Sequence, residues 1–315
     1  MDADDMVVFA GSGSRRLAQR ICQYLGRKLG RNETIRFSEG NIFVRIQENV
    51  RGRRVYLVQS TVFPANDNFM ELLFWIDALK RASADSVTAI IPYFSYAKGD
   101  KKDEPRVSIR ARVCADAIEA AGADRVVTMD LHSPQIQGFF RIPVDNLYAL
   151  PVLCDRIKQM KLNNIIIVSP DTGFAAQARR YASYLGASVA IGDKERIAHD
   201  EKAEVLEIIG DVGGKTAIIV DDFTISGGTL CKAAMKLLEK GAKDVYAMVS
   251  HGVFAEGSME KIASCPLKKL LVTDTVENQP VALSEKIEVV SAAPLFGEAI
   301  KSIHNRDSIS KMFPQ

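Results

Sequence analysis

The stretch Gly214-Lys-Thr-Ala-Ile-Ile-Val-Asp-Asp-Phe-Thr-Ile-Ser-Gly-Gly-Thr229 joins an apolar run, two carboxylates and a glycine-containing turn. Its apolar part, 216–220, is predicted to be a buried strand, and the amphipathic residues 228–240 are predicted to form a helix. A strand that passes through a short polar loop into a helix is the repeating unit of parallel α/β sheets. This stretch therefore predicts a parallel sheet covered by helices.

The same order of features occurs earlier in the chain, with a period of about 160 residues, which is too long for a solenoid repeat. In the first copy, Gly52-Arg-Arg-Val-Tyr-Leu-Val-Gln59 precedes a loop, a helix and Ala82-Ser-Ala-Asp85. In the second copy, the corresponding last segment is Gly241-Ala-Lys-Asp244. We therefore predict an α/β fold with two doubly wound parallel-sheet domains related by duplication, divided into residues 1–147 and 148–315.

Short runs rich in valine and isoleucine alternate with amphipathic stretches along the whole chain, as expected for βαβ units. The predicted strands are 6–10, 54–59, 87–92, 125–129, 164–169, 188–192, 216–220 and 244–251. The predicted helices are 14–29, 69–82, 109–121, 175–185 and 228–240.

Charge and composition exclude several classes of protein. The 315 residues include 41 lysines and arginines against 39 aspartates and glutamates, so the formal net charge is only +2. A balanced charge does not favour nucleic acid or a membrane surface as a partner. The longest apolar runs are strand-sized, and acidic residues open the chain where a secretory signal has a basic flank. Five cysteines without C-x-x-C spacing indicate reduced thiols, so we expect a cytoplasmic protein.

Ligands of open parallel sheets bind beyond the carboxyl ends of the strands, and the strand 216–220 ends at Asp221 and Asp222. The following loop, 225–229, supplies glycine backbone and hydroxyl groups at the start of a helix, which suits a phosphate monoester. The paired carboxylates suit the vicinal hydroxyls of a sugar or a Mg²⁺ ion. The alternative is an acidic strand end with an ordinary glycine turn, which does not account for two adjacent aspartates.

Two further predicted strands end at polar clusters, Asp130-Leu-His132 and Ser169-Pro-Asp171. Because His132 and Asp171 lie at the edge where ligands bind, we expect a Mg²⁺ or phosphate role for them. A purely structural role is an equal alternative, since a lone histidine is commonly a satisfied structural residue.

Two charged segments lie between predicted elements. Residues 193–204 favour a solvated hairpin tip; the alternative is a flap whose Lys194 and Arg196 close over a polyphosphate. Residues 98–103, with basic side chains beyond them, suit a nucleoside triphosphate or an anionic regulator, and a solvated loop is an equal alternative.

The chain resembles the ribose-phosphate pyrophosphokinase family, in particular its phosphate-regulated class, over essentially its whole length. The most specific matching segments are Asp130-Leu-His-Ser-Pro-Gln-Ile-Gln-Gly-Phe-Phe140, Ile142-Pro-Val-Asp-Asn-Leu-Tyr148, Ser169-Pro-Asp171, and Val220-Asp-Asp222 with Gly227-Gly-Thr229. The resemblance implies two phosphoribosyltransferase-like domains. It also implies Mg²⁺-dependent transfer of the diphosphoryl group of ATP to the anomeric hydroxyl of ribose 5-phosphate, giving phosphoribosyl pyrophosphate and AMP.

The resemblance also assigns roles to residues of this chain. It implies that Asp221 and Asp222 hold the ribose hydroxyls, and that the catalytic pair is Lys194 and Arg196, which replaces the solvated-tip interpretation. The 5-phosphate loop would comprise Ile225, Ser226, Gly227, Gly228 and Thr229. The Mg²⁺ side would comprise His132, Asp171 and Asp130. ATP would be bound by Phe37, Glu39, Asn41, Lys98, Gly99 and Asp103, with Phe37 and Glu39 reaching adenine from a neighbouring subunit of a homo-oligomer, usually a hexamer built from dimers.

Several positions depart from the family pattern. Ile225 stands where the phosphate loop usually has an aspartate, and Lys98-Gly99 stands where the ATP loop usually reads Arg-Gln. Asn41 replaces a carboxylate, and Phe174 replaces a glycine. These departures motivate two alternatives: a non-catalytic paralogue that binds phosphorylated ligands and modulates an active partner, or a phosphoribosyltransferase. The duplicated domain disfavours the phosphoribosyltransferase.

Overall fold

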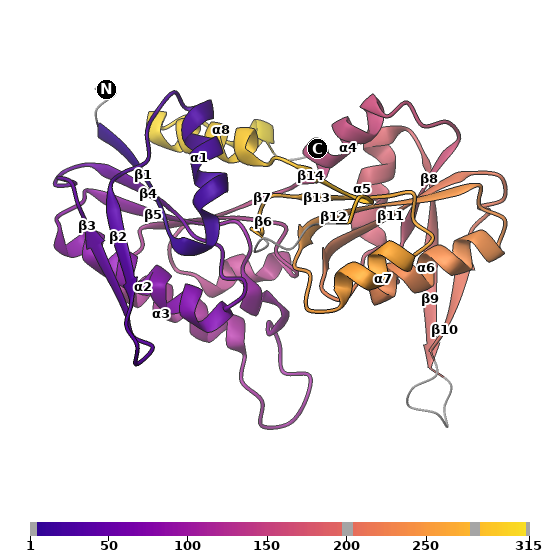
Figure 1. The fold of residues 1–315 in the computed structure, drawn as a ribbon, viewed down its shortest axis with the longest axis horizontal. Helices are drawn as coiled ribbons and strands as arrows, with labels where there is room; N and C mark the ends of the chain where they lie inside the picture. The colour runs from indigo at the N-terminus through magenta and orange to yellow at the C-terminus, as the bar shows by residue number, and fades with distance from the viewer. Residues whose placement is uncertain (1–4, 197–203, 278–283, 313–315) are drawn as a thin grey trace.

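The computed structural model describes residues 5–196, 204–277 and 284–312, and its first half is built on a five-stranded parallel sheet (Figure 1). Helix α1 (Arg15–Tyr24) packs on one face of this sheet, and α2 (Ala65–Arg81) and α3 (Arg110–Ala121) pack on the other. In spatial order, its strands are β1 (Met6–Ala10), β4 (Arg54–Val58), β5 (Ser86–Ile91), β6 (Arg125–Met129) and β7 (Val144–Leu147).

The second half is built on a seven-stranded sheet, which is parallel except for the β9–β10 pair. Its faces are covered by α4 (Leu150–Gln159) and α5 (Ala175–Leu185) on one side, and by α6 (Gly228–Glu239) and α7 (Ser258–Ser264) on the other. The spatial order of its strands is β10 (Glu204–Ile209), β9 (Ser188–Arg196), β8 (Ile165–Ser169), β11 (Thr216–Thr224), β12 (Asp244–Gly252), β13 (Lys269–Thr273) and β14 (Ile287–Val290).

The chain changes direction across this second sheet. It passes from β8 outward to β9, and then returns to add β11 to β14 on the other side of β8. Such a reversal places a crevice at the carboxyl ends of the two central strands, where ligands of doubly wound sheets bind. The first sheet has no reversal, because its strands follow one another in chain order.

One apolar layer is shared by the two sheets. It contains α1, α4, α5 and α8 (Ala293–Asn305) together with residues from one face of each sheet. Although α8 follows the second sheet in the chain, it packs against α1 of the first half (Figure 1). The Arg54 side chain of the first sheet donates to the backbone carbonyl of His304 in this helix at 2.7 Å. The two halves are therefore joined by a common core.

Shorter elements complete the fold. The antiparallel hairpin β2 (Asn32–Arg36) and β3 (Ile42–Ile46) lies at the outer end of the first half, away from the second sheet (Figure 1). The 3-10 turns are η2 (Ser12–Ser14), η3 (Ser95–Lys98), η4 (Pro134–Phe139) and η5 (Ser310–Met312). No helix in the described part of the chain is both long and apolar enough to span a membrane.

The predicted fold class is confirmed: the protein is α/β, and both faces of each parallel sheet carry helices. Each predicted strand and helix is present, with ends that differ by a few residues. The strands β2, β3, β7, β10, β13 and β14 and the helices α4, α7 and α8 were not predicted. The predicted division after residue 147 falls between β7 and α4, while α8 crosses back over it.

Candidate active site

The two sheets meet at the carboxyl ends of their strands, and a hydrogen bond joins them there. His132 follows β6 of the first sheet, and its Nδ1 donates to Oδ2 of Asp222 on β11 of the second sheet at 2.7 Å. The Asp222 side chain is nearly buried, whereas that of His132 is half exposed. Two residues that lie 90 positions apart in the sequence are thus fixed in one site.

Asp221 and Asp222 form an acidic pair at the edge of this site. Burial, followed by the neighbouring Asp222 carboxylate, raises the pKa of Asp221 well above its usual value, and the Asp171 charge acts in the same direction. Carboxylates that repel one another in a largely buried position favour a cation or hydroxyl donors as ligands. The structure therefore supports the predicted sugar or Mg²⁺ contact at this strand end.

The His132–Asp222 hydrogen bond predicts an NMR titration. This bond raises the pKa of His132 above its usual value, so its stabilising effect is present at low pH and is lost as the pH rises through that raised pKa. Asp222→Asn is expected to bring the His132 pKa down again. In ¹H–¹⁵N spectra of the metal-free protein, His304 of α8, whose pKa is lowered by burial and does not respond to Asp222, serves as the internal reference. An unchanged His132 titration in the variant would contradict this assignment.

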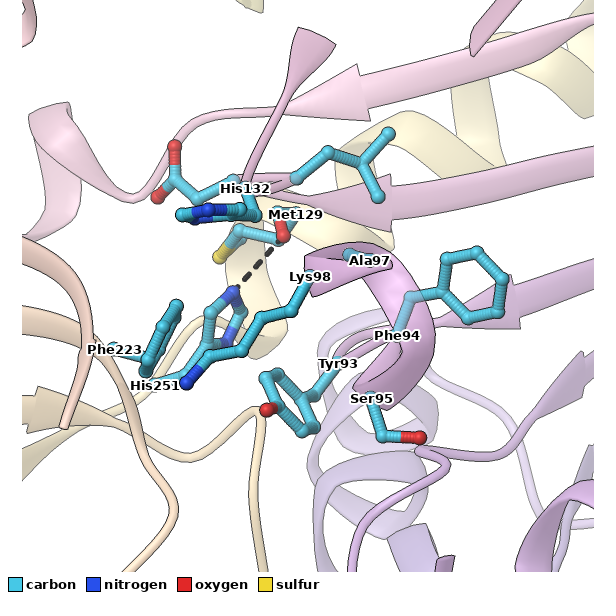
Figure 2. A pocket seen from close by; sticks show the side chains of 11 residues that line it. Tyr93, Phe94, Ser95, Ala97, Lys98, Met129, His132, Phe223 and His251 are labelled. Carbon is cyan, nitrogen blue, oxygen red and sulfur yellow. Dashed lines mark hydrogen bonds between the residues drawn. The ribbon is translucent and has the colours of Figure 1, made fainter. Parts of the chain in front are cut away.

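Asp130 and His251 support the site from beneath. The Asp130 side chain accepts hydrogen bonds from the Ala149 N–H and the Ser250 hydroxyl, and burial raises its pKa to about 6. His251 Nε2 donates to the Met129 carbonyl at 3.0 Å, and the Thr275 hydroxyl lies 2.8 Å from its Nδ1 (Figure 2). These contacts hold the backbone of the strand end that carries His132.

The predicted 5-phosphate loop follows β11 and begins helix α6. Gly227 precedes the helix with a φ of 73°, and the Gly228 N–H donates to the Ser226 hydroxyl at 3.3 Å. The Thr229 side chain lies in the exposed first turn, whereas Ile225 packs with an apolar cluster behind the loop. The loop thus brings backbone N–H groups and hydroxyls to the end of the strand, as the phosphate assignment requires.

The conformation of Gly227 predicts a matched pair of variants. An alanine Cβ at 227 would lie 2.9 Å from Cγ1 of Ile262, in addition to the strain of a positive φ. Gly227→Ala is expected to lower the stability by about 1–3 kcal/mol and to raise the KM for ribose phosphate. Gly257→Ala is the control, because Gly257 also precedes a helix at a φ of 76° but has no neighbour within 4 Å. Equal KM values for the two variants would contradict a role of the loop in binding.

A cavity of about 310 Å³ opens beside His132 and Asp222. Its walls are formed largely by residues 130–135 and by α5 with the turn before it. They include Phe174, which departs from the family pattern, together with Tyr148 and Arg180, which the sequence did not mark as site residues. The Arg180 guanidinium lies over the Tyr148 ring at 5.7 Å. The only sequence signal for Arg180 is that α5 follows the Ser169-Pro-Asp171 strand end. Asp171 itself accepts a hydrogen bond from the Phe174 N–H at 3.1 Å, which shapes the turn into α5.

A second pocket is lined by residues from four strand ends (Figure 2). Tyr93 and Lys98 come from the segment after β5, His132 from the segment after β6, Phe223 from β11 and His251 from β12. Lys98 is the only ATP-binding residue of the prediction that lies in this pocket. Phe223 and Tyr93 line it as well, although nothing in their sequence context predicts a role in a site.

The other predicted ATP-binding residues are dispersed. Phe37, Glu39 and Asn41 are exposed at the tip of the β2–β3 hairpin, where the Asn41 amide donates to Glu39 at 3.3 Å. Asp103 is exposed in the loop that leads to α3. Gly99 packs under Arg110, whose Nε lies 2.6 Å from where a Cβ at 99 would be. Within one chain, the structure does not bring the hairpin tip to the His132–Asp222 site (Figure 1).

The predicted catalytic pair lies on β9. In the β9–β10 hairpin, Lys194 is paired with Leu206 and Arg196 with Glu204. The hairpin projects from the body of the second half (Figure 1). The side chains of this pair lie outside the described residues, so their roles stay predictions.

The donor atoms of the site fit a metal that is shared with a substrate. Across residues 5–196, 204–277 and 284–312, no group of three or more His, Cys, Asp or Glu side chains is arranged to hold a metal ion. Mg²⁺, however, usually binds through one or two carboxylates together with substrate phosphates. Burial and the charges of Asp222 and Asp171 raise the pKa of Asp221, so this strand end gathers carboxylates of the kind that such shared coordination would use.

Two helix-covered parallel sheets, the second of which ends in an acidic pair followed by a glycine turn, define a phosphoribosyltransferase-like protein. The family model for the N-terminal domain of ribose phosphate pyrophosphokinase matches residues 6–122, and the model for the phosphoribosyl synthetase-associated domain matches residues 195–314. The chain belongs to the ribose-phosphate pyrophosphokinase family, as the resemblance in the sequence predicted.

Full-length relatives agree with this assignment. The ribose-phosphate pyrophosphokinase of Agrobacterium fabrum is 49% identical over 310 residues, which cover 98% of this chain and 100% of that protein. The enzyme of Rhizobium meliloti is 48% identical over the same shares of both chains. The crystal structure of phosphoribosylpyrophosphate synthetase from Mycobacterium smegmatis has a TM-score of 0.90 at 37% identity, covering 96% of this chain and 99% of that one.

Proposed function

We propose that this chain is a ribose-phosphate diphosphokinase, which transfers the diphosphoryl group of ATP to the anomeric hydroxyl of ribose 5-phosphate in a Mg²⁺-dependent reaction. The observation that carries the proposal is the 2.7 Å His132–Asp222 hydrogen bond, because it joins the nucleotide side of the first half to the sugar side of the second. Membership of the pyrophosphokinase family, with full coverage of its curated relatives, supports the same reaction.

The site residues divide the work between the two substrates. Asp221 and Asp222 accept hydrogen bonds from the ribose hydroxyls, while loop 225–229 binds the 5-phosphate. The anomeric hydroxyl oxygen then forms a bond to the β-phosphorus of ATP and loses its proton to solvent, while the bond from that phosphorus to the α,β-bridging oxygen breaks and AMP leaves with that oxygen. Holding both substrates in line supplies much of the rate, since phosphoryl transfer depends mainly on positioning and charge stabilisation.

Positive charge must compensate the charge that develops on the transferred group. Lys194 and Arg196 are proposed to provide it from the β9–β10 hairpin, and Lys98 from the end of η3. Mg²⁺ would be held at the Asp171 side of the site, next to His132 and with Asp130 behind it, and would neutralise phosphate charge when bound.

The adenine site is proposed to require a second subunit. Phe37 is 45% exposed, and Glu39 and Asn41 lie beside it on a hairpin at the outer end of the first half, away from the second sheet (Figure 1). We propose that these three residues complete the ATP site of a neighbouring copy in a homo-oligomer, a hexamer built from dimers.

We also propose that the protein is cytoplasmic. All five cysteines are described, and none forms a disulfide, which supports this location.

The experiment that tests the proposed function follows which bond of ATP is cleaved. The purified protein with Mg²⁺, ATP and ribose 5-phosphate should release AMP, whereas ribose without the phosphate should give almost none. AMP no higher than that of a Lys194→Ala control, across a range of phosphate and ADP concentrations, would overturn the proposal. If an inactive homomer co-purifies with an active synthase, the regulatory alternative is favoured. Release of pyrophosphate that depends on an added base would indicate a phosphoribosyltransferase.

A further inference from the structure

Lys98 and Phe223 form a contact between the two halves of the chain. Lys98 ends the turn η3 of the first half, and Phe223 follows Asp222 on β11 of the second. The Lys98 Nζ lies 3.7 Å from the centroid of the Phe223 ring, and Figure 2 shows the lysine side chain extending across the pocket to that ring. The His132 ring lies 5.6 Å from the same ring.

The ring holds a cation that would otherwise be free to move. A lysine ammonium is a compact charge on a flexible four-carbon chain, and it lacks the planar fork with which arginine grips a phosphate. The face of an aromatic ring attracts such a cation, and more strongly where water is partly excluded. Burial lowers the pKa of Lys98, while Asp222 and Asp221 oppose that change, so the ammonium sits in a partly desolvated, acidic surrounding.

We propose that Phe223 is a positioning residue for ATP: its ring holds the Lys98 ammonium at the boundary between the two substrates before the triphosphate arrives. This inference rests on the proposed function and names a further residue for it. Because the rotamers of Lys98 are already restricted, less side-chain entropy is lost when the triphosphate binds. Lys98 stands where the family usually has arginine, and the Phe223 ring of the other half fixes the orientation of its side chain.

The alternative is that Phe223 only fills space, and a double-mutant cycle separates the two roles. Phe223→Leu keeps an apolar side chain of similar length but removes the ring, whereas Phe223→Tyr keeps the ring. The affinity for α,β-methylene-ATP with Mg²⁺, measured by calorimetry, is expected to fall about tenfold in Phe223→Leu. It should fall much less in Phe223→Tyr. In a Lys98→Met background, Phe223→Leu should cause almost no further loss, because the cation it positions is absent.

A spectroscopic measurement gives a readout that is independent of turnover. After ¹³C reductive methylation, the Lys98 dimethylamine should show an upfield ring-current shift in the wild type and in Phe223→Tyr, but not in Phe223→Leu. The inference is overturned if Phe223→Leu binds the analogue as tightly as the wild type, if it weakens binding equally without Lys98, or if the shift is absent from the wild type. A wild type that binds the analogue with this pattern, yet makes no AMP, would overturn the proposed function alone.

Discussion

Lys194→Ala is expected to lower the turnover number for AMP formation by on the order of a thousandfold. Phosphoryl transfer leaves little covalent chemistry to the protein, so a cation placed where negative charge develops supplies a large part of the rate. Lys194 lies on a hairpin that projects beyond the sheet, and we propose that this projection brings its charge to the polyphosphate. Arg196→Ala, two residues further along the same strand, is expected to have a similar effect.

The measurement is AMP release at saturating ATP and ribose 5-phosphate, so that weaker binding does not mimic slower chemistry. Lys268→Ala is the matched control, since Lys268 pairs with Asp244 at the opposite, amino-terminal edge of the same sheet. It should retain full turnover. A defect in Lys194→Ala that is confined to KM would show that this lysine binds ATP equally in the ground state and the transition state, contrary to the proposed role.

Asp221→Asn is expected to raise the KM for ribose 5-phosphate by about ten- to hundredfold, with a smaller change in the KM for ATP. A hydrogen bond from a hydroxyl to a charged acceptor contributes about 1.5–3 kcal/mol, and an amide in the same place loses that charge. Burial and the repulsion by Asp222 raise the pKa of Asp221 in the free protein, and both effects are offset when hydroxyls or a cation bind there. The carboxylate therefore gains more from the ligand than an isolated surface aspartate would.

Steady-state kinetics with each substrate varied in turn separates the two KM values. Asp244→Asn, at the amino-terminal start of the neighbouring strand β12, is the control for the loss of one carboxylate from this sheet. An unchanged KM for ribose 5-phosphate in Asp221→Asn, or an equal rise in the control, would contradict the proposal that Asp221 binds the sugar.

The sequence predicts the central strands well, because strands that are buried on both faces are continuous apolar runs with polar loops at each end. The strand ends in turn predict His132, Asp171 and the acidic pair, since the carboxyl ends of parallel strands meet at one edge of a sheet. Asp222 illustrates the limit of this reasoning. Its position at the edge is evident from the sequence, but its hydrogen bond to His132 depends on how the two halves pack.

Other features had no local signal. The β2–β3 hairpin is only partly buried and has no regular alternation of apolar and polar residues, so it does not read as a pair of strands. Strand β9 continues through charged residues to Arg196, because beyond Ile191 it pairs with β10 alone in a projecting hairpin, where charges are tolerated. The Lys98–Phe223 contact and the cavity wall at Arg180 depend on tertiary packing between segments that are distant in the sequence.

The apolar layer that runs beneath both sheets has a consequence for how the enzyme works. Proteins that close by hinge motion of two domains have a separate core in each domain. Here the two halves share one core, because α8 returns from the second half to pack on α1. We therefore expect the distance between the sugar site and the nucleotide site to be fixed by the fold. Any movement that accompanies substrate binding is then expected in segments at the surface and not between the two halves. For the same reason, neither half expressed alone should remain a stable monomer, because each would expose to water the part of the apolar layer that the other half covers.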